Sequence, residues 1–79
     1  MIDYLNLKNS YIAAIQMGLA LNAGYEDAKR GNDLLHKFCE KCVDNSNYSD
    51  NEKQNMKHDL ELVKEALSQE IERHFHIAG

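Results

Sequence analysis

The sequence predicts an all-α protein, a small antiparallel bundle of helices formed by a single domain over residues 1–79. Three observations lead to this class. Proline is absent from the chain, so no residue forces a break in a helix. The β-branched residues that strands favour are scarce. Apolar side chains recur at steps of three and four residues in three segments, at about 3–22, 25–43 and 50–75.

The first predicted helix, at about 3–22, carries two apolar stripes. No charged residue lies between Lys8 and Glu26. At about 100° per residue, one face is formed by Tyr4, Tyr11, Ile12, Ile15 and Leu19. The second stripe consists of Leu7, Ala14, Met17 and Leu21. A helix that is apolar on two sides is normally covered on two sides.

A helix end is predicted at Asn22-Ala23-Gly24, because glycine tolerates the left-handed conformation that follows many helices. The alternative is one long helix through Gly24, which would give a two-helix hairpin. Gly24 and Gly31 together weaken a continuous helix, so three helices are favoured. The corner at residues 23–28 resembles the helix–turn–helix corner of tetratricopeptide repeats, and the resemblance covers this corner alone.

The second predicted helix, at about 25–43, has a less regular apolar face. We expect this face to consist of Ala28, Leu35, Phe38, Cys39 and Cys42. His36 is expected to point away from it.

The third predicted helix, at about 50–75, follows a polar loop at 44–49 that is rich in Asn and Ser. Ser49 and Glu52 have the spacing of a capping box, in which each side chain bonds the other residue's backbone amide. One apolar stripe follows, formed by Met56, Leu60, Val63, Leu67 and Ile71.

Charge and length exclude several classes of partner. The net charge is −4 and the basic residues form no patch, so no nucleic-acid partner is expected. The apolar run at 11–21 is too short to span a bilayer and follows no positively charged segment, so neither a membrane partner nor secretion is expected. Two cysteines three residues apart do not form a disulfide framework of the kind found in secreted proteins, so we expect a protein of the reducing cytoplasm.

His36, Cys39 and Cys42 are the strongest candidates for chemistry. Structural zinc takes four such ligands that converge tetrahedrally. Both cysteines share the expected apolar face, and buried cysteine behaves as a small hydrophobe, so core packing is favoured and no metal or cofactor is expected. No serine or glutamate lies in a nucleophile or acid–base motif, so a non-enzymatic protein is expected.

These observations favour a small protein–protein interaction module that binds and regulates, inhibits or chaperones a larger protein partner. In so short a chain, two helices are too few to cover both stripes of the first helix, and exposed apolar patches mark binding sites. Tyrosine is also enriched at contacts, with Tyr11 expected in the core and Tyr48 in an exposed loop. The partner-binding candidates are Leu7, Tyr11, Ala14, Met17, Leu21 and Tyr48. The alternatives are a homodimeric structural bundle and a Cys/His metal-binding module.

Overall fold

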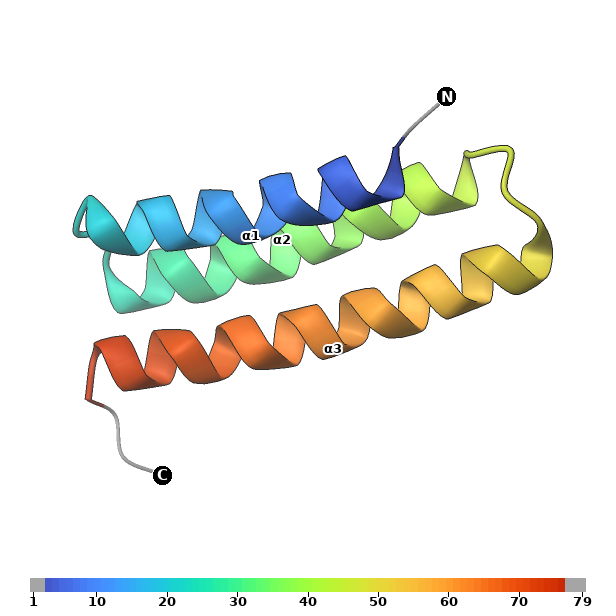
Figure 1. The fold of residues 1–79 in the computed structure, drawn as a ribbon. Coiled ribbons are helices and arrows are strands. Elements are labelled where there is room, and N and C mark those ends of the chain that lie inside the picture. Colours follow the sequence, from blue (N-terminus) through green and yellow to red (C-terminus); the bar gives the residue numbers. More distant parts are fainter. Residues whose placement is uncertain (1–2, 77–79) are drawn as a thin grey trace.

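The computed structural model describes residues 3–76, which form a three-helix antiparallel bundle (Figure 1). The helices are α1 (Tyr4–Ala20), α2 (Tyr25–Asp44) and α3 (Asp50–His74). The bundle is elongated, with extents of 40 × 24 × 16 Å. α1 and α2 lie side by side, and α3 packs along both of them. The prediction of an all-α three-helix bundle is confirmed, and the two-helix alternative is wrong.

The break between α1 and α2 is a Schellman motif that is built on Asn22. Asn22 has a φ of 67°, the left-handed conformation that asparagine adopts more readily than most residues. The amide of Ala23 donates to the carbonyl of Gly18 at 2.9 Å, and the amide of Asn22 donates to that of Leu19 at 3.1 Å. Gly24, which we expected to supply the left-handed residue, has a φ of −70° and is the N-cap of α2.

Side-chain caps define the starts of the other two helices. The Asp3 carboxylate accepts hydrogen bonds from the amides of Leu5 and Asn6 at the start of α1. At the start of α3, Ser49 and Glu52 form the predicted capping box, with both reciprocal bonds in place.

The core runs along the centre of the bundle where the three helices meet. The side chains that are most completely enclosed are Tyr11, Cys39, Val43, Leu60 and Ile71. Ile15 and Leu19 continue the α1 side of the core, and Leu67 continues the α3 side. The first stripe predicted for α1 is therefore its buried face, as is the stripe predicted for α3.

A polar bridge crosses this core and ties all three helices together. Asn32 on α2 is only 3% exposed. Its side-chain oxygen accepts a hydrogen bond from the Tyr11 hydroxyl on α1. Its amide nitrogen donates to the backbone carbonyl of Lys64 on α3 at 3.1 Å. Because buried polar groups are costly when unpaired, this set of bonds favours one register of the three helices.

The buried face of α2 differs from the one we expected. It consists of Ala28, Asn32, His36, Cys39 and Val43. The expectation that His36 points away from the core is wrong, since it is 4% exposed. Phe38, expected to be buried, is 57% exposed. The buried strip of α2 thus contains two polar residues. Asn32 is hydrogen-bonded to both neighbouring helices, and His36 lies beside one carboxylate of α2 and one of α3.

Candidate partner-binding face

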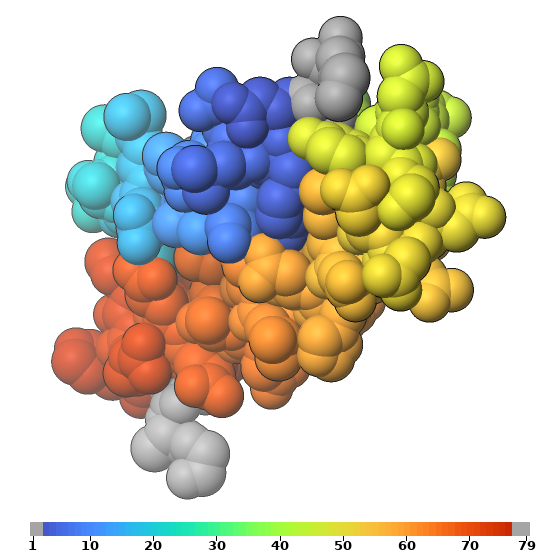
Figure 2. Space-filling model, turned by 45° about the vertical axis from the view of Figure 1, so that its right-hand side comes forward, coloured from blue at the N-terminus to red at the C-terminus, as the bar shows by residue number. Residues whose placement is uncertain are grey.

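The second apolar stripe of α1 remains largely uncovered in the bundle. Met17 and Leu21 are 63% and 75% exposed, and Ala14 is also exposed. Leu7 is half-buried, because it packs against the core near α2. Figure 2 shows α1 and α3 side by side along one side of the molecule, with the loop between α2 and α3 at one end. The third helix covers the first stripe of α1 and leaves the second to solvent.

Helix α2 extends this apolar surface. Leu34 and Phe38, one helical turn apart, are each 57% exposed. Leu35 beside them is half-buried. We call the combined surface the α1–α2 face; it consists of Leu7, Ser10, Ala14, Met17, Leu21, Leu34, Leu35 and Phe38. The part contributed by α1 holds no charged residue.

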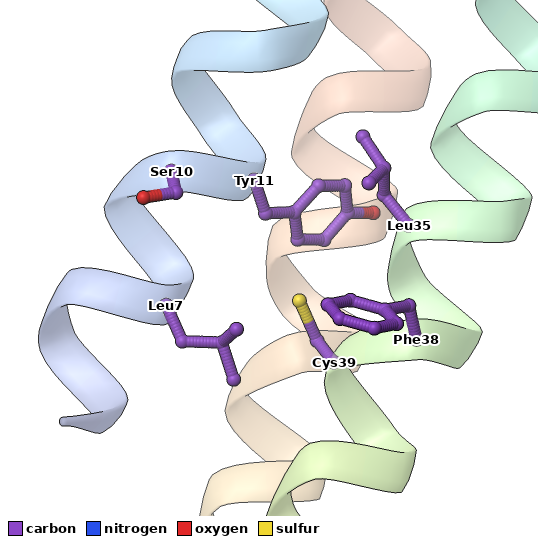
Figure 3. Close-up of a pocket in the computed structure, with 6 residues that line it drawn as sticks. All are labelled: Leu7, Ser10, Tyr11, Leu35, Phe38 and Cys39. Atoms are coloured by element: carbon purple, nitrogen blue, oxygen red, sulfur yellow. The ribbon is translucent and has the colours of Figure 1, made fainter. Parts of the chain in front are cut away.

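A hollow of about 90 Å³ lies in this face, between α1 and α2 (Figure 3). Its walls are Leu7, Ser10 and Tyr11 from α1 and Leu35, Phe38 and Cys39 from α2. The side chains of Leu7 and Phe38 point toward each other across it. Small-molecule pockets in proteins measure about 300–1,000 Å³. A volume this small suits one aliphatic side chain of a docked protein.

Tyr11, one of the residues expected to contact a partner, lies in the core with 2% of its surface exposed. Its hydroxyl donates to Asn32, and burial raises the pKa of the hydroxyl above its usual value. Its side chain also lines the hollow. Any contact that Tyr11 makes with a partner is therefore confined to the hollow.

Tyr48, another expected contact residue, lies at one end of the bundle and is half-buried, whereas we expected it in an exposed loop. Its hydroxyl accepts a hydrogen bond from the backbone amide of Tyr4 at 3.4 Å. Tyr48 thus holds the loop at 45–49 against the start of α1, away from Met17 and Leu21. The structure does not bring it together with the other candidates.

The two cysteines lie on α2, and both are free thiols. Cys39 is 1% exposed, and Cys42 is partly exposed. Burial, followed by the neighbouring Cys42, raises the pKa of the Cys39 thiol to about 11. A thiol with so high a pKa is a weak nucleophile and metal ligand at neutral pH. His36 does not join the cysteines, so the Cys/His ligand set considered from the sequence does not assemble.

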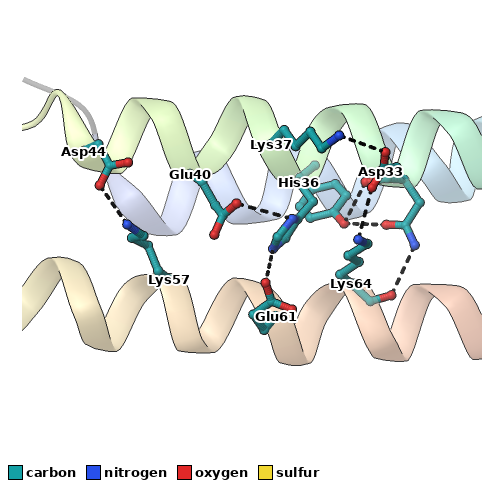
Figure 4. Close-up of polar contacts among 10 residues, drawn as sticks. Asp33, His36, Lys37, Glu40, Asp44, Lys57, Glu61 and Lys64 are labelled. Atoms are coloured by element: carbon teal, nitrogen blue, oxygen red, sulfur yellow. Dashed lines mark hydrogen bonds and ion pairs between the residues drawn. The ribbon is translucent and has the colours of Figure 1, made fainter.

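His36 instead lies between two carboxylates at the junction of α2 and α3 (Figure 4). Its Nδ1 is 3.6 Å from Glu40 Oε1, one turn along α2. Its Nε2 is 3.3 Å from Glu61 Oε1 on α3. The sequence contains no sign of this group, because Glu61 lies 25 residues from His36 and on a different helix.

A second polar contact joins α1 to α3 at the start of the bundle. The Tyr4 hydroxyl donates to Asp59 Oδ2 at 2.5 Å, and Lys8 Nζ lies 3.0 Å from the same oxygen. The hydrogen bond from Tyr4, together with Lys8, holds the pKa of Asp59 below its usual value. This contact fixes α1 against α3 and leaves the opposite side of α1 uncovered.

Comparison with protein families, characterised proteins and solved structures finds no match to the chain. The resemblance of residues 23–28 to a tetratricopeptide corner is therefore not accompanied by a family assignment. Within residues 3–76, no helix has the length and apolar character needed to cross a membrane.

Proposed function

We propose that this protein is a small, non-enzymatic interaction module that binds a helical segment of a larger protein on its α1–α2 face, and so regulates, inhibits or chaperones that protein. The observation that carries the proposal is the exposure of large apolar side chains on both helices of this face, Met17 and Leu21 on α1 and Leu34 and Phe38 on α2. Apolar patches on small soluble domains mark interaction sites.

The shape of the face supports a helix as the bound element. Two antiparallel helices leave a seam between them, and a further helix laid along such a seam completes a four-helix bundle. Amphipathic helices bind grooves of this kind through apolar side chains spaced three or four residues apart. The hollow between Leu7 and Phe38 would accept one of these side chains.

The energetic scale is adequate for specific binding. Complete burial of a leucine, methionine or phenylalanine side chain contributes about 1.5–3 kcal/mol. More than half of the surface of Met17, Leu21 and Phe38 is exposed in the bundle, so most of this contribution is still available to each side chain on binding.

We propose that the protein meets its partner in the cytoplasm. Both cysteines are free and residues 3–76 contain no disulfide, which is compatible with this reducing compartment.

A photoreactive amino acid placed at residue 38 tests the proposal in the protein's own cells. The matched control is the same group at Leu62 on α3, which is also 57% exposed but lies outside the α1–α2 face. A discrete adduct with another protein from position 38, absent from position 62, supports the proposal. Substitution of Met17 by lysine should weaken that adduct. Equal labelling from both positions would contradict it.

A homodimer is the second candidate, and one observation favours it. Asp27 and Lys41, both exposed on α2, lie seven residues before and seven residues after Leu34. If two copies of α2 packed antiparallel about Leu34, Asp27 of each would lie opposite Lys41 of the other, as a symmetric interface requires. In the same experiment, an adduct of twice the chain mass would identify this arrangement.

A further inference from the structure

The group formed by His36, Glu40 and Glu61 is separate from the α1–α2 face and has a chemistry of its own. We propose that it is a site for a divalent transition-metal ion of the zinc class, held by His36 Nε2 and a carboxylate oxygen of Glu61, with Glu40 as the residue that orients the histidine. One nitrogen or oxygen from each of the three residues lies within 4.8 Å of the other two.

The first support is the state of the histidine ring. The His36 side chain is 5% exposed, and its Nε2 atom makes no hydrogen bond, although Glu61 Oε1 is 3.3 Å away. A buried nitrogen without a partner destabilises the folded state, because it has lost its hydrogen bond to water. A metal ion at Nε2 would remove this cost, since a neutral imidazole nitrogen is among the commonest metal ligands.

The second support is the distance between Nε2 and Glu61 Oε1. Zinc binds nitrogen and oxygen at about 2.0–2.2 Å with tetrahedral geometry, so two of its ligands lie about 3.3–3.5 Å apart. The observed 3.3 Å fits this value. An ion bound by both atoms would lie along the lone pair of Nε2, with the Glu61 oxygen to one side of that direction. This position of the oxygen agrees with the lack of a hydrogen bond between the two atoms.

The third support is the position of Glu40. It lies 3.6 Å from Nδ1, the ring nitrogen that would not bind the metal. Metal-binding histidines commonly donate their second ring N–H to a carboxylate, which fixes the tautomer with Nε2 free for the ion. Figure 4 shows the ring reaching from α2 toward α3, with one glutamate at each nitrogen.

The local charge also favours a cation. Among residues 3–76, neither Glu40 nor Glu61 has a lysine or arginine within ion-pair distance. The lysines on either side of Glu61 along α3, Lys57 and Lys64, pair with aspartates of α2. Two carboxylates thus converge on one histidine, and the 60% exposure of the Glu61 side chain gives an ion access from solvent. Water would complete the coordination.

Zinc titration of the full chain at neutral pH, with a phosphine reductant, tests this site. The readout is the pair of ring-nitrogen resonances of each histidine in a long-range ¹H–¹⁵N correlation spectrum. We expect zinc to shift His36 Nε2 saturably, with Nδ1 remaining protonated. Glu61→Gln should weaken zinc binding at His36 by about tenfold or more, and Glu40→Gln by about 10–100-fold. His58→Asn, an exposed histidine elsewhere on α3, should leave the His36 response unchanged.

Three results would overturn the proposal. Zinc that shifts only the ring nitrogens of His74 and His76 would show adventitious surface binding. A His36 ring with both nitrogens protonated at neutral pH and no response to zinc would make the group an imidazolium paired with two carboxylates. An unchanged zinc response in a folded Glu61→Gln variant, with helicity checked by circular dichroism, would exclude Glu61 as a ligand.

Discussion

Replacing Tyr11 by phenylalanine tests whether the polar bridge through Asn32 stabilises the bundle. The change removes one hydroxyl group and retains the ring in a site that is 2% exposed. The Asn32 side-chain oxygen then loses its donor inside the core. A buried acceptor left without a partner costs about 1–3 kcal/mol. At about 0.05–0.15 kcal/mol per residue, a domain of this size has a total stability of about 4–12 kcal/mol, so the loss is large.

Urea unfolding followed by circular dichroism measures this cost directly. A loss of 1–3 kcal/mol also corresponds to a fall in Tm of about 4–24 °C for a domain of this size. The matched control is Tyr25→Phe. The Tyr25 hydroxyl also donates to a side chain, Glu72, but at the edge of the bundle where water can replace the bond. We expect that control to change the free energy of unfolding by about 0.5 kcal/mol or less.

A double-mutant cycle isolates the interaction itself. Asn32→Leu removes the side-chain bonds to Tyr11 and to the Lys64 carbonyl, and leaves the backbone carbonyl of residue 32, which is 3.2 Å from the Tyr11 hydroxyl. In the double variant neither polar partner is left unpaired, so its destabilisation should fall short of the sum of the single losses by about 0.5–3 kcal/mol. Additive losses, or a Tyr11→Phe cost no larger than that of Tyr25→Phe, would refute the role of the bridge.

Four further predictions concern stability and thiol chemistry. Leu60→Ala should lower the free energy of unfolding by about 2–5 kcal/mol in urea melts, because Leu60 is fully buried. Ser49→Ala should cost about 0.5–2 kcal/mol through loss of the α3 cap, with Ser68→Ala as an exposed control near zero. The lowered pKa of Asp59 means that its contribution is present above the unfolded value of about 3.9 and is lost as pH falls through the folded value. The stability difference between wild type and Asp59→Asn should therefore shrink in melts at acid pH, and a constant difference would contradict the pairing with Tyr4 and Lys8. The Cys39 pKa of about 11 predicts that the contribution of this protonated thiol to stability is constant below about pH 8.5 and is lost as pH rises toward 11. It also predicts slow reaction of the native Cys42→Ser variant with a thiol reagent at pH 8.

The regularly patterned helices were the easiest to predict from sequence. The capping box at Ser49 and the stripe through Leu60 and Ile71 predicted α3 closely, since both signals are local to the helix. In α1, the two apolar stripes were visible as periodicity, but periodicity alone does not tell which stripe a neighbouring helix covers. The contacts with α3, such as that from Tyr4 to Asp59, decide this.

The buried face of α2 could not be read from hydropathy. Asn32 is polar, yet it is buried because its hydrogen-bond partners come from other helices. His36 is buried between two carboxylates, one of which comes from α3. Phe38 is apolar but largely exposed, since neither α1 nor α3 covers that side of α2. The candidate metal site could not be predicted from the sequence either, because it forms only when α3 packs on α2 and brings Glu61 close to His36.

The proposed function requires that the α1–α2 face be open on a single chain and available to another protein. Light scattering at several concentrations, at neutral pH with reductant, tests this most directly. We expect one mass of 9.1 kDa at every concentration, with no change on Leu21→Glu substitution. A stable species of twice that mass, which Leu21→Glu converts to monomer, would show that a second copy covers the face and would contradict the proposed partner.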